Sequence, residues 1–242
     1  MRKYRILVVV AALCAFVISG CSKNSNASAA ASQDAVVGLS GRTNVSSDGG
    51  FAKSDVAILV IDMQNDFVLP GAVLCVAGAQ ATIPTIQELL SYGRQKGHHI
   101  IHVIREHRYS GADVDKPRVP LFTDGKQGYC VPGTKGWEIV EGLEPRTGDI
   151  IVSKRRNSGF FQTELDMVLR RLGVKTVVIA GTQYPNCIRG TAADAMSYDY
   201  DTIVVTDACS AKTPEVAEAN IFDMKNMGIT CIPLAELKAM SL

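Results

Sequence analysis

The sequence has no basic stripe, no Cys-x-x-Cys motif and no apolar run long enough to span a bilayer. Its 25 lysine and arginine residues nearly balance 24 aspartate and glutamate residues, for a formal net charge of +1. No nucleic-acid partner is therefore expected. The missing Cys-x-x-Cys argues against a dithiol redox protein. The longest apolar run, residues 6–18, has 13 residues, whereas a membrane-spanning helix needs about 20.

The N-terminus has the features of a bacterial lipoprotein signal. A basic start, MRKYR, precedes the apolar run 6–18, and ISGC at 18–21 resembles the lipobox, whose cysteine becomes the lipidated first residue. We expect residues 1–20 to be the signal peptide and Cys21 to carry the lipid, so that the membrane is a partner through this N-terminal lipid. An ordinary secretory signal cleaved nearby is the alternative.

The segment 21–53 is rich in serine, alanine, asparagine and glycine, and it contains too little apolar sequence to fold. We expect a lipidated flexible tether here, followed by one domain over residues 54–242. The predicted location is the bacterial cell envelope, on its periplasmic or extracellular face.

Seven cysteines are present, of which two fall in the predicted signal peptide and lipid site. Five remain in the domain, and an odd number leaves at least one thiol unpaired within the chain. The sequence does not decide whether Cys75 and Cys130 form a disulfide. An exported compartment permits disulfides, but the sequence does not set the distance between the two residues. Cys209 and Cys231 are expected to be small buried residues of the core.

Short β-branched runs alternate with helix-like segments through the domain. The runs predict six strands, at 57–61, 100–104, 149–152, 176–180, 202–206 and 229–234. Helices are predicted between most of them, at 83–96, 163–172, 188–198 and 214–227. The strands are apolar on both faces, which is typical of a parallel sheet covered by helices on both sides. One long irregular stretch, 106–148, interrupts the pattern, and a loop of that length is often functional.

Polar residues follow the predicted strands at the edge where ligands bind in such sheets. Asp62, Arg105, Lys154 and Cys187 each end or follow a different strand. Because the carboxyl ends of parallel strands lie at one edge, we expect these side chains to converge there. Asp207 also ends a predicted strand, and we expect it to be a structural turn residue rather than a catalytic one.

Asp62, Lys154 and Cys187 together could support nucleophilic catalysis. Cys187 precedes a predicted helix, whose N-terminus favours the thiolate, and a nearby lysine would favour it further. Asp62 could take the thiol proton and later deliver it to a departing amine, with Lys154 holding the carboxylate. Each residue alone also has a structural explanation: a helix cap for the aspartate, a solvated rim position for the lysine and core packing for the cysteine.

Three segments carry a family resemblance. They are AILVIDMQNDF (57–67), VSKRRNSGFFQTELDMVLRRLGV (152–174) and VVIAGTQYPNCIRGTAADAMSYDYDTIVVTDACSA (177–211). In this order and spacing they resemble the isochorismatase-like cysteine hydrolases, which include nicotinamidases, N-carbamoylsarcosine amidohydrolase, and biuret and ureidoacrylate hydrolases. The resemblance covers nearly all of residues 54–234. It implies a Rossmann-like, three-layer α/β/α sandwich around a six-stranded, mostly parallel sheet, with Asp62, Lys154 and Cys187 as the catalytic triad.

The resemblance also implies how the site is built. A non-proline cis peptide is expected at Thr182–Gln183, and it would aim the Gln183 N–H, beside that of Cys187, at the oxyanion. Phe67 corresponds to an aromatic residue that lines the substrate pocket in relatives. Two residues that flank the nucleophile are further candidates for shaping the pocket, Tyr184 and Asn186.

Several arginines lie near the same edge or in the long stretch: Arg105, Arg108, Arg118, Arg155 and Arg156. A guanidinium binds a carboxylate well, so any of them could hold a carboxylate of the substrate. The favoured expectation is that they pair with Glu106, Asp113 and Asp115 or face solvent. Arg105 is the best candidate for substrate binding, because it ends a strand.

The chain departs from nicotinamidases where those enzymes bind a metal. They have an Asp-x-His pair and further histidines after the second strand, whereas residues 104–118 read IREHRYSGADVDKPR. Of the four histidines, His107 alone lies in the corresponding loop. We therefore expect no metal and no other cofactor, and we do not expect nicotinamide as the substrate.

These observations lead to one main functional prediction and two alternatives. The main one is a hydrolase that cleaves a C–N bond of a small amide, ureido or carbamoyl compound through a cysteine thioester, releasing ammonia or an amine. One alternative is an isochorismatase-type hydrolase in which Cys187 is not the nucleophile, and the other is a catalytically silent binding protein at the envelope. Because oligomers are common in the family, we also expect a homo-oligomer.

Overall fold

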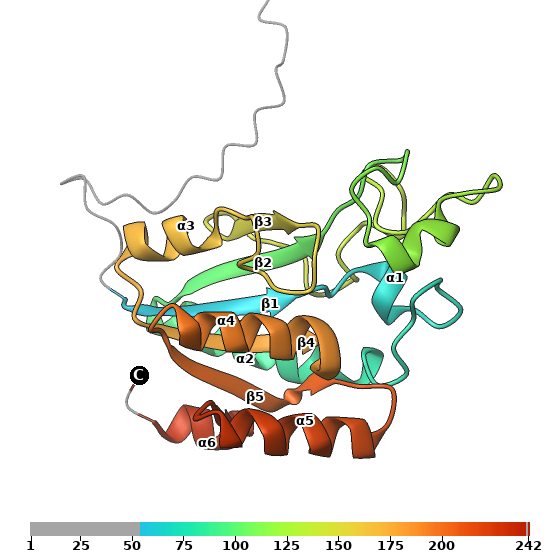
Figure 1. The fold of residues 1–242 in the computed structure, drawn as a ribbon. Coiled ribbons are helices and arrows are strands. Elements are labelled where there is room, and N and C mark those ends of the chain that lie inside the picture. The colour runs from blue at the N-terminus through green and yellow to red at the C-terminus, as the bar shows by residue number, and fades with distance from the viewer. Residues whose placement is uncertain (1–53, 241) are drawn as a thin grey trace, which may run out of the picture. The chain divides into compact units, whose positions relative to one another are not determined.

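The computed structural model describes residues 54–240 and residue 242, which form an α/β fold (Figure 1). The predicted signal peptide 1–20, the lipid site Cys21 and the tether 21–53 lie outside the described residues, so they remain predictions. Within the described part of the chain, no helix is both long and apolar enough to cross a membrane.

Six strands form one parallel sheet in the order β3-β2-β1-β4-β5-β6. They are β1 (Val56–Ile61), β2 (His99–Arg105), β3 (Ile150–Lys154), β4 (Thr176–Thr182), β5 (Asp201–Ser210) and β6 (Thr230–Ile232). The order of the strands reverses between β1 and β4. Ligands of open parallel sheets bind beyond the carboxyl ends of the strands at such a reversal.

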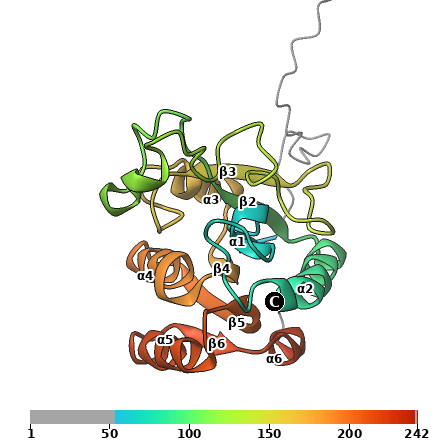
Figure 2. The same cartoon turned by 90° about the vertical axis from the view of Figure 1, so that its right-hand side faces the viewer.

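Helices cover both faces of the sheet (Figure 2). One face carries α3 (Leu165–Leu172), α4 (Arg189–Ser197) and α5 (Pro214–Asn226), and the other carries α2 (Ile83–Lys96) and α6 (Leu234–Ala239). The short elements are α1 (Asn65–Val68), the 3-10 helices η1 (Gln80–Thr82) and η2 (Lys116–Leu121), and the π-helical turn η3 (Tyr184–Ile188). The expected three-layer α/β/α sandwich is thereby confirmed.

Helix α2 shows how the sequence sets these elements. Its buried residues, Ile86, Leu89, Leu90 and Gly93, recur at spacings of three and four, so one face of the helix packs on the sheet. Gly97 ends the helix in the left-handed conformation, with φ of 74°, which glycine adopts without the steric cost of a Cβ. The bounds of this helix match the prediction.

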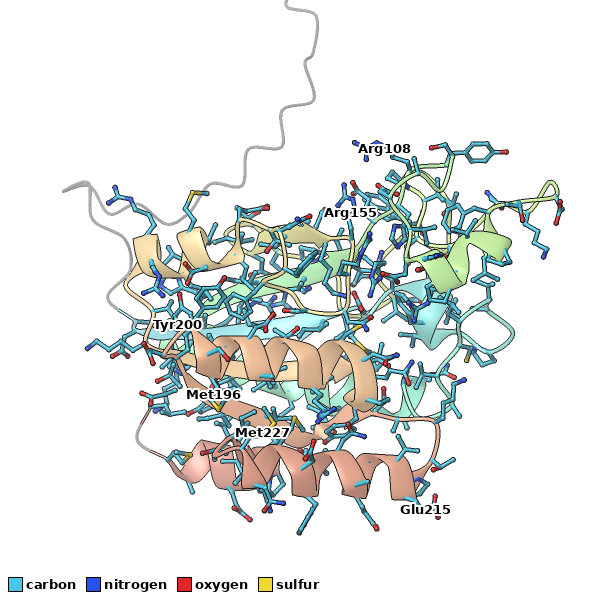
Figure 3. The ribbon with its side chains drawn as sticks, in the orientation of Figure 1. Arg108, Arg155, Met196, Tyr200, Glu215 and Met227 are labelled. Carbon is cyan, nitrogen blue, oxygen red and sulfur yellow. The ribbon has the colours of Figure 1, made fainter. Side chains whose placement is uncertain are left out.

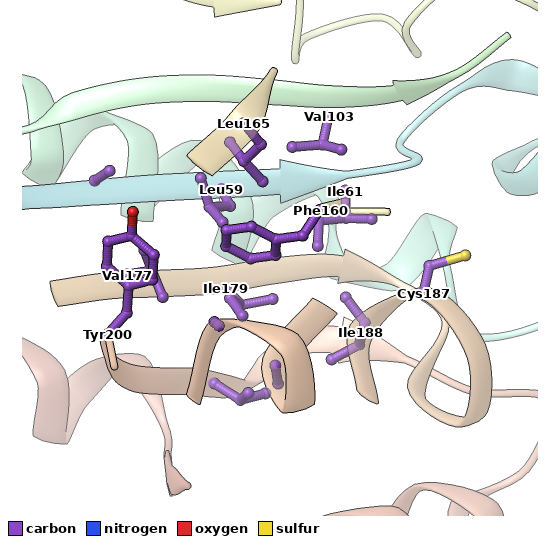
Figure 4. Packing of buried hydrophobic residues seen from close by; sticks show 14 of the residues in the cluster. Leu59, Ile61, Val103, Phe160, Leu165, Val177, Ile179, Cys187, Ile188 and Tyr200 are labelled. Carbon is purple, nitrogen blue, oxygen red and sulfur yellow. The ribbon is translucent and has the colours of Figure 1, made fainter. Parts of the chain in front are cut away.

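Strand β1 is buried at every position, and its side chains alternate between two cores. Leu59 and Ile61 pack toward α3, α4 and α5 (Figure 4), whereas Ile58 and Val60 pack toward α2 and α6. A strand covered on both faces needs apolar residues at consecutive positions, which explains the continuous AILVI run.

The end of the sheet differs from the prediction in two places. Strand β5 continues to Ser210, past a register shift in its pairing with β4, so Asp207 lies inside the strand. The last strand ends at Ile232 and α6 begins at Leu234, because Pro233 has no N–H to continue a strand ladder. Asp207 Oδ1 accepts a hydrogen bond of 2.9 Å from the Leu234 N–H, which confirms its structural role.

The irregular stretch 106–148 lies over the carboxyl edge of the sheet, at the right of Figure 1. Two side chains that follow β1 fasten it there. Gln64 Nε2 donates to the carbonyls of Arg105 (2.9 Å) and Trp137 (2.7 Å), and Asp66 Oδ2 accepts from the Cys130 N–H (2.7 Å). The stretch is thus anchored beside the predicted site.

Candidate active site

Asp62, Arg105, Lys154 and Cys187 converge at the carboxyl edge of the sheet, as predicted, and all four are buried. Arg105 and Lys154 are register partners at the ends of β2 and β3. Asp62 follows β1, where its N–H donates to the Val103 carbonyl at 2.9 Å. A small pocket opens here, beside the reversal of strand order, and Asp62, Arg105 and Cys187 all line it.

Asp62 and Lys154 form a buried ion pair, with Lys154 Nζ 2.7 Å from Asp62 Oδ2 and both side chains at most 1% exposed. Lys154 Nζ also donates to the Arg156 carbonyl at 3.1 Å. Such charges are stable inside a protein only when they are paired and hydrogen-bonded. The second carboxylate oxygen, Asp62 Oδ1, is buried and accepts no hydrogen bond of ordinary geometry. It is the free proton acceptor of the pair.

Cys187 lies in the π-helical turn η3 between β4 and α4, at the end of the core cluster shown in Figure 4. The expected cis peptide at Thr182–Gln183 is present. Gly181 has φ of 118°, and a Cβ there would lie 2.1 Å from the Ile61 carbonyl oxygen, so only glycine fits. The Cys187 carbonyl accepts a 2.6 Å hydrogen bond from Thr191 Oγ1. These constraints fix the backbone around the sulfur.

The pKa of the Cys187 thiol is raised, and this corrects one expectation. Burial raises it most, and the Asp62 carboxylate raises it further, whereas Lys154 and Arg105 lower it. We expected the helix start and the lysine to favour the thiolate. Burial and the adjacent carboxylate outweigh the charges of Lys154 and Arg105, so the net effect of the surroundings is to raise the pKa of the thiol.

Arg105 contacts the Cys187 sulfur directly. Its side chain is 2% exposed, and one terminal nitrogen donates to Cys187 Sγ at 3.5 Å. The guanidinium also donates to Asp115 Oδ2 (3.4 Å), and to Asn157 Oδ1 (3.3 Å). Although burial opposes its charge, the nearby Asp62 and Cys187 raise the pKa of Arg105 above its ordinary value. A permanent cation therefore lies against the sulfur.

The pocket contains three of the four predicted substrate-binding residues, Phe67, Arg105 and Asn186, and it is also lined by Gln183, the predicted oxyanion donor. Tyr184 does not line the pocket: it is buried in the core, and its hydroxyl donates to the Thr206 carbonyl at 2.9 Å. Its side chain leaves η3 on the side away from the pocket, which proximity in sequence to Cys187 does not reveal.

Three pocket residues were not predicted, Val76, Tyr129 and Thr182, and a fourth, Arg118, was named only as one of five arginines that could hold a substrate carboxylate. Arg118 and Tyr129 belong to the stretch 106–148. That stretch was expected to be functional, but its irregular sequence gives no periodicity from which the inward-facing residues could be chosen.

Arg108, Arg155 and Arg156 pair with acidic side chains, as we expected. Arg155 contacts Glu106 (3.1 Å) and Asp113 (3.3 Å), and Arg108 contacts Asp113 (3.2 Å). Figure 3 shows Arg108 and Arg155 at the outer side of the long stretch. Arg156 contacts Asp115 at 3.4 Å. These pairs tie the stretch to β3.

His107, the histidine of the loop after the second strand, is part of the buried packing. His107 is fully buried, packs edge-on against Phe122 and Tyr129, and lies 3.4 Å from Asp113. Burial lowers its pKa to about 4. Over residues 54–240 and 242, no three histidine, cysteine or acidic side chains gather in a way that could hold a metal ion. Cys75 and Cys130 are not joined by a disulfide in this structure.

Known proteins share this sequence and fold. Residues 56–236 match the isochorismatase domain. The chain is 44% identical over 184 residues to the "probable inactive nicotinamidase" of Arabidopsis thaliana, covering 75% of this chain and 94% of that protein. It is 32% identical over 178 residues to maleamate amidohydrolase of Pseudomonas putida, covering 72% and 81%. A solved isochorismatase family protein from Desulfovibrio vulgaris is 57% identical, with a TM-score of 0.75, covering 76% of this chain and 97% of that one. The chain belongs to the isochorismatase family.

Proposed function

We propose that this protein is a cysteine amidohydrolase that cleaves a C–N bond of a small amide, ureido or carbamoyl compound. One observation carries the proposal: Asp62 is bound to Lys154 through Oδ2, while Oδ1 is free and the carboxylate raises the pKa of the adjacent Cys187 thiol. A nucleophile and a base held together in this way are typical of covalent catalysis. The similarity to an amidohydrolase of Pseudomonas putida supports C–N bonds as the target.

In the first half of the reaction the Cys187 sulfur attacks the substrate carbonyl carbon, and the thiol proton passes to Asp62. The C–S bond forms as the carbonyl π electrons move to oxygen. The oxyanion then collapses, the C–N bond breaks, and the leaving nitrogen takes the proton from Asp62. The products of this half are a thioester on Cys187 and free ammonia or an amine.

In the second half, water attacks the thioester carbon and gives a proton to Asp62. Collapse of the second oxyanion breaks the C–S bond, and the sulfur regains the proton from Asp62. The acid product leaves and the resting thiol is restored. Throughout, Lys154 keeps Asp62 in place, and Arg105 stabilises negative charge on the sulfur at 3.5 Å. The backbone N–H groups of Gln183 and Cys187 are our proposed oxyanion donors.

A silent binding protein is the second candidate, and one observation favours it. The Arabidopsis relative at 44% identity is named as inactive. Against this stands the complete Asp62–Lys154–Cys187 arrangement, whose buried ion pair a protein without catalytic need could replace with apolar residues at little cost or even with a gain in stability.

Ammonia release from a panel of primary amides and ureido compounds separates these candidates. We expect release by the wild type and a loss of at least about 1,000-fold in Cys187→Ala, with circular dichroism showing that the fold survives. Cys75→Ala is the matched control, since Cys75 is a free cysteine that does not line the pocket. Full activity in Cys187→Ala would leave the cysteine a bystander, and no release by the wild type would favour the silent protein.

For the N-terminus we propose a lipid on Cys21 that anchors the hydrolase domain to the cell envelope. The lipobox-like ISGC sequence supports this. Metabolic labelling with a radioactive fatty acid in a bacterial host should mark the wild type and not Cys21→Ser. A label that persists in Cys21→Ser, or an unlabelled wild type released into the soluble fraction, would contradict the anchor.

A further inference from the structure

Tyr129 carries a buried hydroxyl that has no hydrogen-bond partner. Its side chain is 1% exposed and it lines the pocket. A buried tyrosine hydroxyl ordinarily finds a partner, because leaving one unpaired costs about 1–3 kcal/mol. Nothing in the catalytic steps above uses this group, so it is available to a ligand in the pocket.

The ring of Tyr129 is held from three sides. Phe67, His107 and Phe122 pack edge-on against it, with ring centroids 6.1, 5.0 and 5.5 Å away. Such packing fixes the ring plane, so the hydroxyl keeps its direction with no ligand present. A group held in advance in this way binds without the entropy cost of being ordered.

Two arginines lie near this hydroxyl, and Asp115, which pairs with both of them, is also close enough to act on its pKa. Arg105 and Arg118 both line the pocket, and both are close enough to Tyr129 to oppose, by their charges, the rise in its pKa that burial causes. The net pKa is about 12, so the hydroxyl is protonated at neutral pH and can donate. Asp62 alone among the lining residues is acidic, and Lys154 pairs with it.

We propose that Tyr129 and Arg118 form the binding subsite for a carboxylate on the substrate. The substrate is then a short amide, ureido or carbamoyl acid, with its scissile carbonyl at Cys187 and its carboxylate at this subsite. This assignment of the substrate class rests on the proposed function. Arg118 suits the role because its side chain is 28% exposed and can turn from Asp115 to a ligand. Asp115 keeps Arg105 and Arg156 as partners when it does.

Binding to the Cys187→Ala protein tests the subsite without any chemistry. The probes are malonamate, succinamate and glutaramate, each paired with the neutral amide in which a methyl group replaces the carboxylate; for succinamate this is butyramide. Calorimetry should show at least one acid binding about tenfold or more tighter than its neutral partner, as a charge-assisted hydrogen bond implies. Equal binding within every pair, or no binding by any acid, overturns the proposal.

Two substitutions in the same background locate the carboxylate. Tyr129→Phe keeps the ring and its packing and removes only the hydroxyl, and Arg118→Gln removes the charge. Each should weaken binding of the acid about tenfold and leave the neutral amide unchanged. Tyr109→Phe is the matched control, since Tyr109 lies on the same stretch and is 73% exposed. An unchanged ratio of acid to neutral amide in both variants overturns the assignment.

The proposed function and this subsite fail in different ways. If the wild-type protein binds the acids selectively but releases no ammonia from them, the carboxylate subsite stands and the proposed hydrolase activity is wrong. If it releases ammonia from butyramide as fast as from succinamate, the hydrolase activity stands and the subsite is wrong.

Discussion

The guanidinium of Arg105 lies 3.5 Å from the sulfur of Cys187, and both side chains are buried. The cation is fixed there by Asp115 and Asn157. It lowers the pKa of a thiol that burial and Asp62 raise. In the proposed mechanism Arg105 therefore stabilises the sulfur as its proton leaves for Asp62.

Replacing Arg105 with glutamine should slow the enzyme. The loss of one charge-assisted contact to the developing thiolate predicts a fall in kcat/KM of about 10- to 100-fold. The pKa of Cys187 should rise at the same time, which peptide mass spectrometry after iodoacetamide labelling at several pH values measures. Arg108→Gln is the control: Arg108 is 70% exposed, so its loss should change the rate less than about twofold. Equal effects of the two substitutions would remove Arg105 from the mechanism.

His107 should make the fold sensitive to mild acid. Burial lowers the pKa of His107 to about 4 in the folded protein, against about 6.5 in an unfolded chain. As the pH falls from about 6.5 to about 4, His107 becomes protonated in the unfolded state but stays neutral in the folded state. The free energy of unfolding therefore decreases through this window, by at most about 3 kcal/mol and by less where water screens the ring.

Urea unfolding at pH 7, 6 and 5 measures this effect in the wild type and in His107→Gln, which has no titrating ring. The variant should lose less stability than the wild type over this range. Asp113 and Asp149, whose pKa values are lowered from 3.8, titrate mainly below it. Parallel decreases in the two proteins would show that His107 does not contribute.

Gly181 should tolerate no side chain. In Gly181→Ala the new Cβ would meet the Ile61 carbonyl at 2.1 Å with φ at 118°, so β1 and β4 would have to move apart behind Cys187. We expect a loss of at least about 3 kcal/mol in the free energy of unfolding. Gly97→Ala also has a positive φ, of 74°, but meets nothing within 4 Å, and it should cost only about 1 kcal/mol. Similar melting temperatures for the two variants would contradict this.

Much of the fold follows from the sequence because local patterns determine it. The continuous apolar runs predicted all six strands, and α2 was predicted to the residue because Gly97 marks its end. The last strand was predicted past Pro233, which ends it, and α6 was not predicted; the first N–H of α6 is bound by Asp207, which lies far away in the chain. Strand β5 was predicted too short for a similar reason: its extension depends on pairing with β4.

The site divides in the same way. Residues at the ends of strands, such as Asp62, Lys154 and Cys187, could be placed together because parallel strands end at one edge. Tyr129 could not, and Arg118 could be named only as one of five candidate arginines, because an irregular stretch has no period that says which side chains face inward. The raised pKa of Cys187 could not be predicted from the sequence either, since it depends on burial, which outweighs the local charges that the sequence shows.

The most direct test of the mechanism measures the thiol pKa of Cys187 and the rate of ammonia release in three proteins. They are the wild type, Lys154→Met, and the double variant Asp62→Asn with Lys154→Met, in which neither charge of the buried pair remains. The wild-type thiol should titrate above the free value of about 8.5. Removing Asp62 should lower that value relative to Lys154→Met alone, and ammonia release should still fall at least about 100-fold below that of Lys154→Met, because the thiol proton has no acceptor. A wild-type thiol that is ionised well below pH 7, together with release that survives the loss of Asp62, would contradict a mechanism in which Asp62 takes the proton from Cys187.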